Sequence, residues 1–554
     1  MKPLWIPLAL LATGHAAYAA QLPSAGSQLQ QIPATPAQDR QAPKVDVQRD
    51  NTSAAPRSDG TKVLVNSLHV ANAHAFSEAD LVAASGFTPG HELTLAELRA
   101  LAAKISGYYR EHGYFLAQVI VPAQDIVKGT VTFSVVEGQY GKVVVRNESS
   151  LEDDVAKNLL AGLNTGDTVN IGPLESRLLQ LSDLPGVAVK STLVPGASAG
   201  ASDLVVDIAP GDRITGSFDA DNAGSRYSGQ NRTGGTLNVN NPSGHGDVAT
   251  LRALTSWDGL NYGRAAYQMQ FGRADAGVAY TALSYDLGNE FESLDAHGTA
   301  QIASVYGRYP LLRSRSANLF VQFDFDAKKF HDRIDAASVI ADKKANVGLL
   351  SLVGDSRDGL GGGGVNSYSL TWTSGKLDLQ SAQALATDAA TARSDGHYDK
   401  LNASFMRLQR LTNAVSLYAA VQGQVATQNL DVSEKMGLGG STSVRAYPEG
   451  ESYVDQGYVL NVEARVLLPA FTDRMPGSLQ AVGFADTGTG RLSKDPWSAG
   501  ENTRTLSGGG IGLNWLGASG FAVKAYYAHK IGAAAATSVP DSDSRIGVSA
   551  VKYF

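Results

Sequence analysis

The 554-residue chain has no cysteine, only 5 methionines, and charged side chains at just 18% of its positions. Without cysteine it is not a disulfide-stapled secreted scaffold, and with 43% hydrophobic residues it lacks the composition of a disordered protein. The formal net charge is -7, and no run of basic residues follows a predicted strand or helix. We therefore expect no nucleic-acid partner.

The chain also lacks an uninterrupted apolar run of eighteen residues after residue 20, so we expect no membrane-spanning helix. Its first residues do contain a short apolar run, Leu4 to Leu11, after a single lysine. Ala17 and Ala19 follow in the A-x-A arrangement, which predicts a signal peptide at residues 1–19. An exported chain without a helical anchor is either free in the periplasm or a barrel in an outer membrane.

Residues 20–61 are rich in Gln, Pro, Ala, Ser and Asp. Such a segment cannot bury enough apolar surface to order itself, so we interpret it as an N-terminal linker that has room for a short helix around residues 27–31. The length of the whole chain then favours two to four further folding units.

Residues 62–138 follow a βααββ pattern, with a first helix opened by Ser77 and a second by Thr94. Thr94 and Glu97 form a capping box, and Gly113 ends the second helix. Residues 139–211 repeat this plan, with helices predicted at 153–160 and 174–181 between alternating strands. We therefore predict two tandem α+β modules of about 75 residues each.

From residue 213 to 554 the chain consists of short alternating segments separated by Gly, Asn, Asp and Ser clusters. A soluble sandwich would also alternate, but the number of segments, the signal peptide and the terminal aromatic Phe554 favour a closed membrane barrel. Apolar rows would then face lipid, and polar rows would line a wet lumen. About 340 residues at roughly 20 per strand predict on the order of 16 antiparallel strands. Two segments illustrate the apolar rows, with Leu319, Val321, Phe323 and Phe325 in one, and Tyr458, Leu460, Val462, Ala464 and Val466 in the other.

Three stretches carry a family resemblance: GYFLAQVIVPAQDIVKGTVTFSVVEG (113–138), LESRLLQLSDLPGVAVKSTLVPG (174–196) and DADNAGSRYSGQNRTGGTLNVNNPSGHGD (219–247). Together they resemble the TpsB transporters of two-partner secretion, and the likeness covers nearly the whole chain. The resemblance implies a mixed fold: periplasmic POTRA domains at 62–138 and 139–211, then an outer-membrane β-barrel at 213–554. It also raises the question, open from the sequence, of whether the N-terminal segment plugs the pore.

The stretch GGSTSVRAYPEGE (439–451) resembles the arginine-bearing motif of the sixth extracellular loop, which folds back into the lumen in this superfamily. Arg445 carries the match, with Tyr447 beside it, although Ala446 replaces a glycine that many relatives have. The alternative is an ordinary solvated turn. An arginine inside a barrel needs a counter-charge, and AVGFADTGTG supplies Asp486 with Phe484, which resemble the family's F-x-D motif.

We name Arg445, Tyr447, Phe484 and Asp486 the loop–lumen lock. Glu463 and Arg465 also face inward in the predicted pattern. They either pair with other lumen charges or only wet the pore, and we favour the second role.

No catalytic, metal or cofactor site is expected. Gly359, Gly361 and Gly364 spell G-x-G-x-x-G, but a strand follows where a dinucleotide site needs a helix N-terminus. GASAG (196–200) spells a nucleophile elbow, but it lies between two strands. The 10 histidines show no ligand spacing.

The resemblance predicts a non-enzymatic, protein-conducting channel. Its POTRA domains would capture an unfolded TpsA-type exoprotein, an adhesin, haemolysin or similar cargo, by adding extended segments to a sheet edge. Further expected partners are the outer-membrane lipids and the barrel-assembly machinery that inserts the protein. The alternatives are an insertase of the same superfamily, whose known pattern has more POTRA repeats, and a solute porin, in which the two modules would have no role. The identity and activation of the cargo and the oligomeric state stay open.

Overall fold

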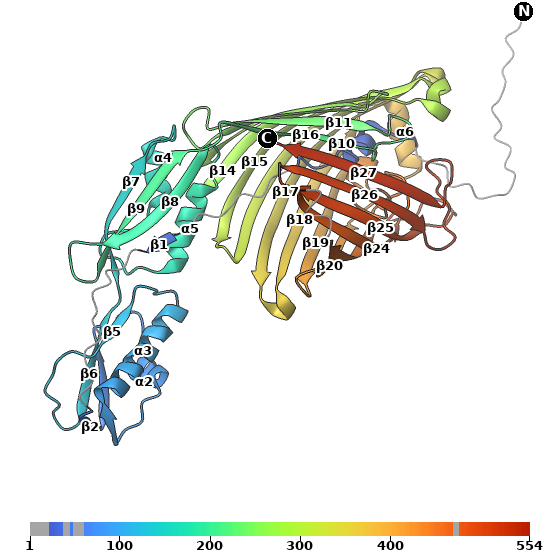
Figure 1. Cartoon of the computed structure of the whole chain (residues 1–554). Helices are drawn as coiled ribbons and strands as arrows, with labels where there is room; N and C mark the ends of the chain where they lie inside the picture. Colours follow the sequence, from blue (N-terminus) through green and yellow to red (C-terminus); the bar gives the residue numbers. More distant parts are fainter. Residues whose placement is uncertain (1–21, 37–44, 48–59, 469–475) are drawn as a thin grey trace, which may run out of the picture.

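The computed structural model describes residues 22–36, 45–47, 60–468 and 476–554. The predicted signal peptide lies outside these residues. Two small α+β units precede a large barrel, and the second unit lies next to the barrel (Figure 1). None of the described helices has the length and apolarity needed to cross a membrane.

The first unit has a three-stranded sheet in the order β3-β6-β5 and a separate β2–β4 ribbon. Ser77 caps the first helix, and Thr94 with Glu97 forms the predicted capping box of the second. The structure divides the predicted first strand into two and adds β4, which was not predicted. The elements are β2 (Lys62–Val65), β3 (Ser67–Ala71), α2 (Glu78–Ser85), β4 (His91–Thr94), α3 (Leu95–Glu111), β5 (Gln118–Ile120) and β6 (Thr130–Val136).

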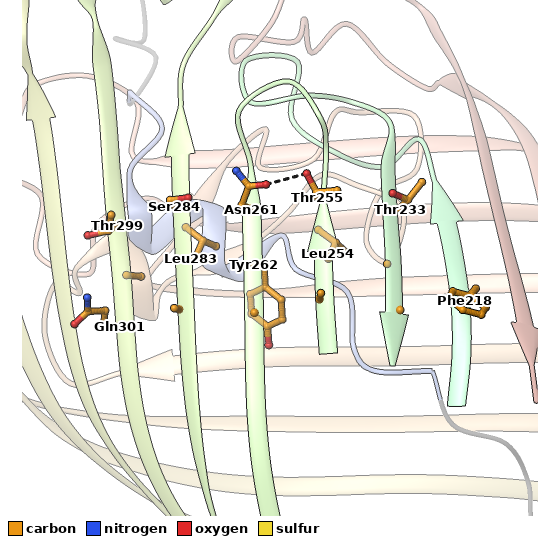
Figure 2. Close-up of a pocket in the computed structure, with 16 residues that line it drawn as sticks. Phe218, Thr233, Leu254, Thr255, Asn261, Tyr262, Leu283, Ser284, Thr299 and Gln301 are labelled. Carbon is orange, nitrogen blue, oxygen red and sulfur yellow. Dashed lines mark hydrogen bonds between the residues drawn. The ribbon is translucent and has the colours of Figure 1, made fainter. Parts of the chain in front are cut away.

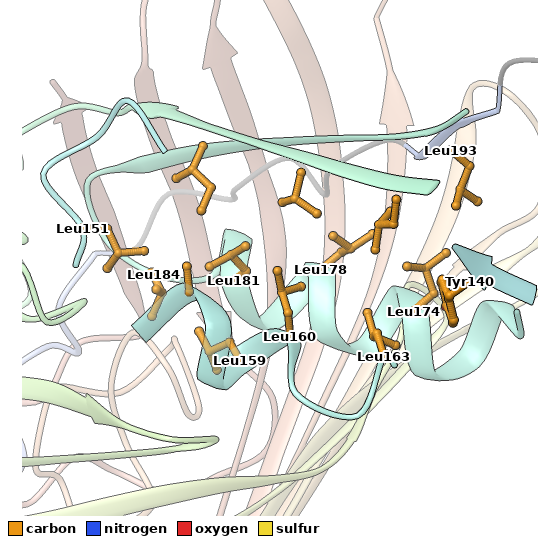
Figure 3. Close-up of a cluster of buried hydrophobic side chains, with 14 of the residues drawn as sticks. Tyr140, Leu151, Leu159, Leu160, Leu163, Leu174, Leu178, Leu181, Leu184 and Leu193 are labelled. Atoms are coloured by element: carbon orange, nitrogen blue, oxygen red, sulfur yellow. The ribbon is translucent and has the colours of Figure 1, made fainter. Parts of the chain in front are cut away.

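The second unit packs two helices on a sheet, over a leucine-rich core (Figure 3). The helix predicted from Leu174 begins earlier, at Ile171, because the Asn170 side chain accepts a hydrogen bond from the Gly172 amide at 2.9 Å. The GASAG stretch lies in the turn between β8 and β9. The elements are β7 (Gln139–Asn147), α4 (Asp153–Leu160), α5 (Ile171–Ser182), β8 (Val187–Pro195) and β9 (Ala201–Pro210).

Part of the predicted linker pairs with this sheet. The short strand β1 (Val45–Val47) runs parallel to β8, and Val45 lies opposite Ser191. The sheet order is β1-β8-β9-β7, so β1 covers the β8 edge. A segment of three residues carries too little pattern to be predicted as a strand.

The barrel has sixteen antiparallel strands and closes by pairing β10 with β27, as predicted. In β16, Phe323 and Phe325 face outward and are exposed, whereas Lys328 faces the lumen. The strands are β10 (Ile214–Asp221), β11 (Arg232–Asn240), β12 (Val248–Thr255), β13 (Asn261–Phe271), β14 (Ala274–Asp286), β15 (Ala296–Arg313), β16 (Ala317–Ile334), β17 (Val339–Asp358), β18 (Gly364–Leu379), β19 (Gly396–Arg410), β20 (Val415–Ala426), β23 (Gln456–Leu467), β24 (Gly477–Arg491), β25 (Thr503–Gly517), β26 (Phe521–Lys530) and β27 (Ser544–Tyr553).

Several short elements lie between the strands. The long β20–β23 loop (residues 427–455) carries three of them: η4 (Val432–Glu434), β21 (Met436–Gly437) and β22 (Tyr453–Val454). The others are η1 (Asn289–Leu294), η2 (Asp335–Ala337), η3 (Leu360–Gly362) and α6 (Ala382–Ala390). A strand, β18, follows the G-x-G-x-x-G stretch, so the context of a dinucleotide site is absent there.

Candidate functional site

Arg445 of the β20–β23 loop lies in the lumen against Asp486 of β24. Its Nε and a terminal guanidinium nitrogen donate to the two carboxylate oxygens of Asp486 at 2.8 and 2.7 Å. The backbone amide of Arg445 adds a third hydrogen bond at 3.2 Å. The Asp486 side chain is fully buried. This bidentate pair therefore fixes both the side chain and the backbone of the loop at one point of the wall.

Glu463 and Phe484 complete the surroundings of this arginine. The remaining terminal nitrogen of Arg445 donates to Glu463 at 2.6 Å, and the guanidinium carbon lies 3.6 Å from the centre of the Phe484 ring. Glu463 also accepts two hydrogen bonds from Arg465. Glu463 and Arg465 thus belong to a paired charge network, and the expectation that they only wet the pore is wrong.

Tyr447 is buried, but among the described residues it makes no hydrogen bond to the charge network. Its hydroxyl donates to the Ala534 carbonyl in the β26–β27 loop (residues 531–543) at 2.7 Å. Next to it, Ala446 is fully buried, and a Cβ added to Gly508 of β25 would lie 2.5 Å from the Ala446 Cβ. The glycine at 508 therefore leaves the space that the methyl group of Ala446 occupies.

Glu451 was not predicted as a site residue, although it ends the same stretch. Its carboxylate, closed to solvent, lies 2.8 Å from Arg504 of β25. It also accepts hydrogen bonds from the backbone and hydroxyl groups of both Thr537 and Ser538. One carboxylate thus connects the β20–β23 loop, the barrel wall and the β26–β27 loop.

The η4 region of the β20–β23 loop is fixed by lysines of the wall. Glu434 lies 2.8 Å from Lys328 and 3.0 Å from Lys400, and Asp431 lies 2.8 Å from Lys343. All of these side chains are at most 15% exposed. Buried carboxylates in this loop are therefore matched by cations on three strands, β16, β17 and β19.

A short helix, α1 (Ala25–Gln30), lies in the lumen beside η4, within the predicted linker (Figure 1). Ser24 caps it, and the side chain of Gln30 donates to the Val432 carbonyl at 2.6 Å. A Cβ on Gly26 would lie 2.8 Å from the Ser433 Cβ, so glycine allows this close approach. On the wall, Ala25 contacts Asp332 and Gln31 contacts Arg232. Gln28 contacts Ser228 in the β10–β11 loop, and Gln31 also contacts Tyr453 of the β20–β23 loop.

The second α+β unit is attached to the strand turns at the opposite end of the barrel. Asp183, at the end of α5, accepts two hydrogen bonds from Arg313, both at 2.7 Å. Arg315 lies 2.8 Å from Glu175. Asp183 and Glu175, which carry part of the family resemblance, thus join the unit to the β15–β16 turn.

Comparison with known proteins places this architecture in a family. The haemolysin secretion/activation proteins ShlB/FhaC/HecB match residues 200–515, and the ShlB-type POTRA domain matches residues 63–138. The chain belongs to this family. It is therefore an outer-membrane transporter of two-partner secretion, with a β-barrel in the membrane and its POTRA region in the periplasm.

Curated relatives agree with this assignment. The heme/hemopexin transporter protein HuxB of Haemophilus influenzae (strain 86-028NP) is 28% identical over 441 residues, which cover 78% of this chain and 77% of HuxB. The outer membrane transporter CdiB of Dickeya dadantii (strain 3937) is 22% identical over 370 residues, 64% of this chain and 63% of the relative.

Solved structures share the fold. CdiB from Escherichia coli aligns with a TM-score of 0.71 at 20% identity, over 91% of this chain and 93% of that one. BamA from Haemophilus ducreyi lacking POTRA domains 1–3 aligns with a TM-score of 0.51 at 13% identity, over 89% of this chain and 100% of that one. At these identities the likeness concerns the fold alone.

The family motif therefore located one contact of a larger site. Arg445, Asp486, Phe484, Glu463 and Arg465 come together, whereas Tyr447 contacts a different loop. The inward-facing glycines of β25, Gly508 and Gly510, are a sequence signal for the place where the loop packs on the wall. A Cβ atom at either position would collide with Ala446 or Phe484. Asp431 and Glu434 had no such signal, since their lysine partners lie 34 to 106 residues away in the sequence, on three different strands.

Proposed function

We propose that the lumen is closed at rest by α1 and the β20–β23 loop, and that export of the partner protein requires both to move. The observation that carries this proposal is the bidentate contact of Arg445 with the fully buried Asp486. The contacts of α1 with Val432 and Asp332 support a coupled movement, because the helix rests on the loop and on the wall at once.

The unit at 139–210 is, in this proposal, a second POTRA domain. A captured partner adds an extended segment to an edge of its sheet, where main-chain hydrogen bonds give affinity. The β8 edge is covered by β1 in the structure, so a segment that binds there displaces β1. The Ile171 amide donates to the Gly113 carbonyl at 2.9 Å, which supports transmission between the two units.

The cargo is an extended, unfolded exoprotein whose folding outside the cell withdraws it from the channel. A partner that binds haem or hemopexin is the first candidate to test, because HuxB carries that name at 28% identity. The chain has no enzymatic step in this scheme, and the barrel-assembly machinery inserts it into the membrane.

A disulfide between α1 and η4 tests the closed state. The chain has no cysteine of its own, so Gly26→Cys with Ser433→Cys introduces a single pair. The Cβ atoms would start about 1 Å closer than the roughly 3.8 Å typical of disulfides, a shift that a short helix can absorb. The oxidised transporter should not export its partner, and reduction should restore export.

The two single-cysteine variants are the controls and should export under both conditions. Full export by the crosslinked transporter would show that α1 need not leave. Failure of the crosslink to form in membranes would show that α1 does not rest on η4.

A further inference from the structure

The neighbouring strands β16 and β17 each carry two consecutive lysines. Because side chains alternate along a strand, one lysine of each pair faces the lumen and the other faces outward. Lys328 on β16 and Lys343 on β17 face the lumen, where Glu434 and Asp431 neutralise them. Lys329 and Lys344, one residue further along each strand, face outward and are exposed. The inward lysines are thus matched by carboxylates of the chain itself.

The two outward lysines face each other across the strand pair instead of each facing a carboxylate. Lys329 lies directly opposite Lys344 in the register of β16 and β17, and like charges in this position destabilise a sheet. Among the residues that the structure describes, neither lysine has an ion pair, and Lys344 donates only to Gln380 at 3.0 Å. A third exposed lysine, Lys376 on β18, lies opposite Asn346 in the next row.

The neighbouring outward groups leave this surface basic. Asp342 is bound by His331, which also contacts Arg333 at 2.7 Å. Two further outward carboxylates lie on the β18 side: Asp378, opposite Lys344, and Asp399 of β19, diagonal to Lys376. Three lysines and Arg333 therefore face two carboxylates beyond the pair of His331 with Asp342, and positive charge is in excess around the opposed Lys329 and Lys344.

The height of these lysines fits the outer headgroup layer. β16 begins at Ala317, next to the turn that binds the second α+β unit in the periplasm. Lys329 lies about 40 Å further along the strand, or roughly 30 Å across the membrane at the usual barrel tilt. The exposed side chains just below it are apolar: Phe323, Phe325, Leu350 and Trp372. Lys329, Lys344 and Lys376 thus stand in the first rows above the lipid-facing band.

The wall beside the lysines is hollowed. Gln301, opposite Lys329 in the register, lines a recess of about 680 Å³ on β10 to β15 (Figure 2). Its floor consists of small residues, Gly235, Ala253, Gly263 and Ala282. Above them runs an unbroken cross-strand row of hydroxyl and amide side chains: Thr233, Thr255, Asn261, Ser284 and Thr299. Such a row can exchange hydrogen bonds with sugar hydroxyls, and the floor leaves room for an acyl chain.

We propose that Lys329, Lys344 and Lys376 bind the phosphate groups of an anionic phosphorylated glycolipid in the outer leaflet, with its sugar along the row above the recess. The two opposed lysines provide the charge, and a phosphate between them removes their repulsion. The lipid is a specific ligand of the barrel wall in addition to the transport function.

Native mass spectrometry of the full-length transporter in detergent tests the site. The probe is a bis-phosphorylated, acylated diglucosamine lipid, compared with the same lipid without phosphates and with inorganic phosphate. The variant Lys329→Gln with Lys344→Gln should bind the probe about tenfold more weakly or worse. The control Lys552→Gln removes an outward lysine at the other end of the barrel, over the Phe521 ring, and should bind as the unchanged protein does.

Several outcomes would overturn the site. These are equal binding by the double variant, equal binding of the lipid without phosphates, or equal loss in Lys552→Gln. If millimolar inorganic phosphate alone displaced the lipid, the three lysines would form a general anion site and not a lipid site. A dimer that disappears in the double variant without added lipid would identify a second copy of the chain as the occupant.

Discussion

The carboxylate of Glu451 and the guanidinium of Arg504 meet 2.8 Å apart in the lumen, with the Glu451 side chain closed to solvent. The same carboxylate accepts hydrogen bonds from Thr537 and Ser538 in the β26–β27 loop. Two extracellular loops and one wall strand thus share a single negative charge. Removing it leaves an arginine and several donors without their acceptor in a poorly solvated place.

Glu451→Ala should therefore release the β26–β27 loop while the barrel stays closed. Breaking a buried pair costs about 3 to 5 kcal/mol, which is enough to displace a loop but small beside sixteen paired strands. We expect protease added to intact cells to cut within residues 531–543 in the variant. Boiled and unboiled samples should still migrate differently on gels.

Asp495→Ala is the matched control, because Asp495 is 69% exposed and pairs only with its neighbour Lys494 in the ion pairs of the described chain. It should leave the cleavage pattern unchanged. An uncut loop in Glu451→Ala would contradict the role of this carboxylate.

Family motifs and alternation predicted the contact of Arg445 with Asp486, because one motif lies on a loop and the other on a regular strand. Glu451, Asp431 and Glu434 could not be predicted in this way. Their roles depend on where a 29-residue loop folds inside the lumen, and neither periodicity nor capping chemistry describes that path.

The same difference separates the predicted from the unpredicted elements of the fold. Helix α3 was predicted because the capping box of Thr94 and Glu97 is local chemistry. The barrel was predicted because alternation repeats over many strands. The strands β4 and β1 were missed because each is stabilised by pairing with a distant partner and is at most four residues long.

Arg445→Ala should reduce export and leave the barrel assembled, because a loop without this contact has no fixed position on the wall from which to move together with α1. A pair of charges at about 4 Å contributes on the order of 4 kcal/mol at an effective dielectric near 20, before desolvation. The variant also leaves Asp486 and Glu463 as neighbouring carboxylates without their shared arginine. Partner protein in the medium, divided by barrel in the membrane, measures the effect.

The charge exchange Arg445→Asp with Asp486→Arg should restore export only in part. The new aspartate would lie against Glu463, which the exchange does not change. Arg465→Ala, which removes only a contact to Glu463 and the ring of Tyr418, should have a smaller effect. If the Arg445→Ala variant exports its partner normally, Arg445 has no role in transport beyond that of an ordinary polar side chain.

Glu137 should make the periplasmic region sensitive to acid. Burial alone would raise the pKa of Glu137, but hydrogen bonds from the amides of Ala75 and His74 and from the Tyr109 hydroxyl outweigh it and lower the pKa below 4.5. A depressed carboxyl pKa contributes stability above the pKa of the unfolded chain, and this contribution is lost as the pH falls through the folded pKa.

Residues 62–211, expressed alone, should therefore fold and lose stability below about pH 4.5. Glu137→Gln should be less stable at pH 7, and its urea midpoint should change less between pH 5 and pH 3 than that of the unchanged unit. Glu111→Gln is the control, since Glu111 is exposed at the end of α3 and its side chain makes no ion pair among the described residues. The same pH slope in Glu137→Gln and the unchanged unit would exclude Glu137 as the source.

The pair of Asp183 with Arg313 should set the position of the second α+β unit under the barrel. Both guanidinium contacts are 2.7 Å long, but Asp183 is 43% exposed, so the pair contributes no more than about 1 kcal/mol and exchanges readily. Asp183→Arg adds repulsion between the unit and the β15–β16 turn. We expect a broader distribution of distances between spin labels at residues 190 and 411, together with reduced export.

The exchange Asp183→Arg with Arg313→Asp should narrow the distribution of label distances and recover export. The control Lys157→Asp, on the exposed face of α4, should change neither the distances nor export. An unchanged distribution in Asp183→Arg would mean that the remaining contacts of α5, such as Glu175 with Arg315, position the unit without this pair.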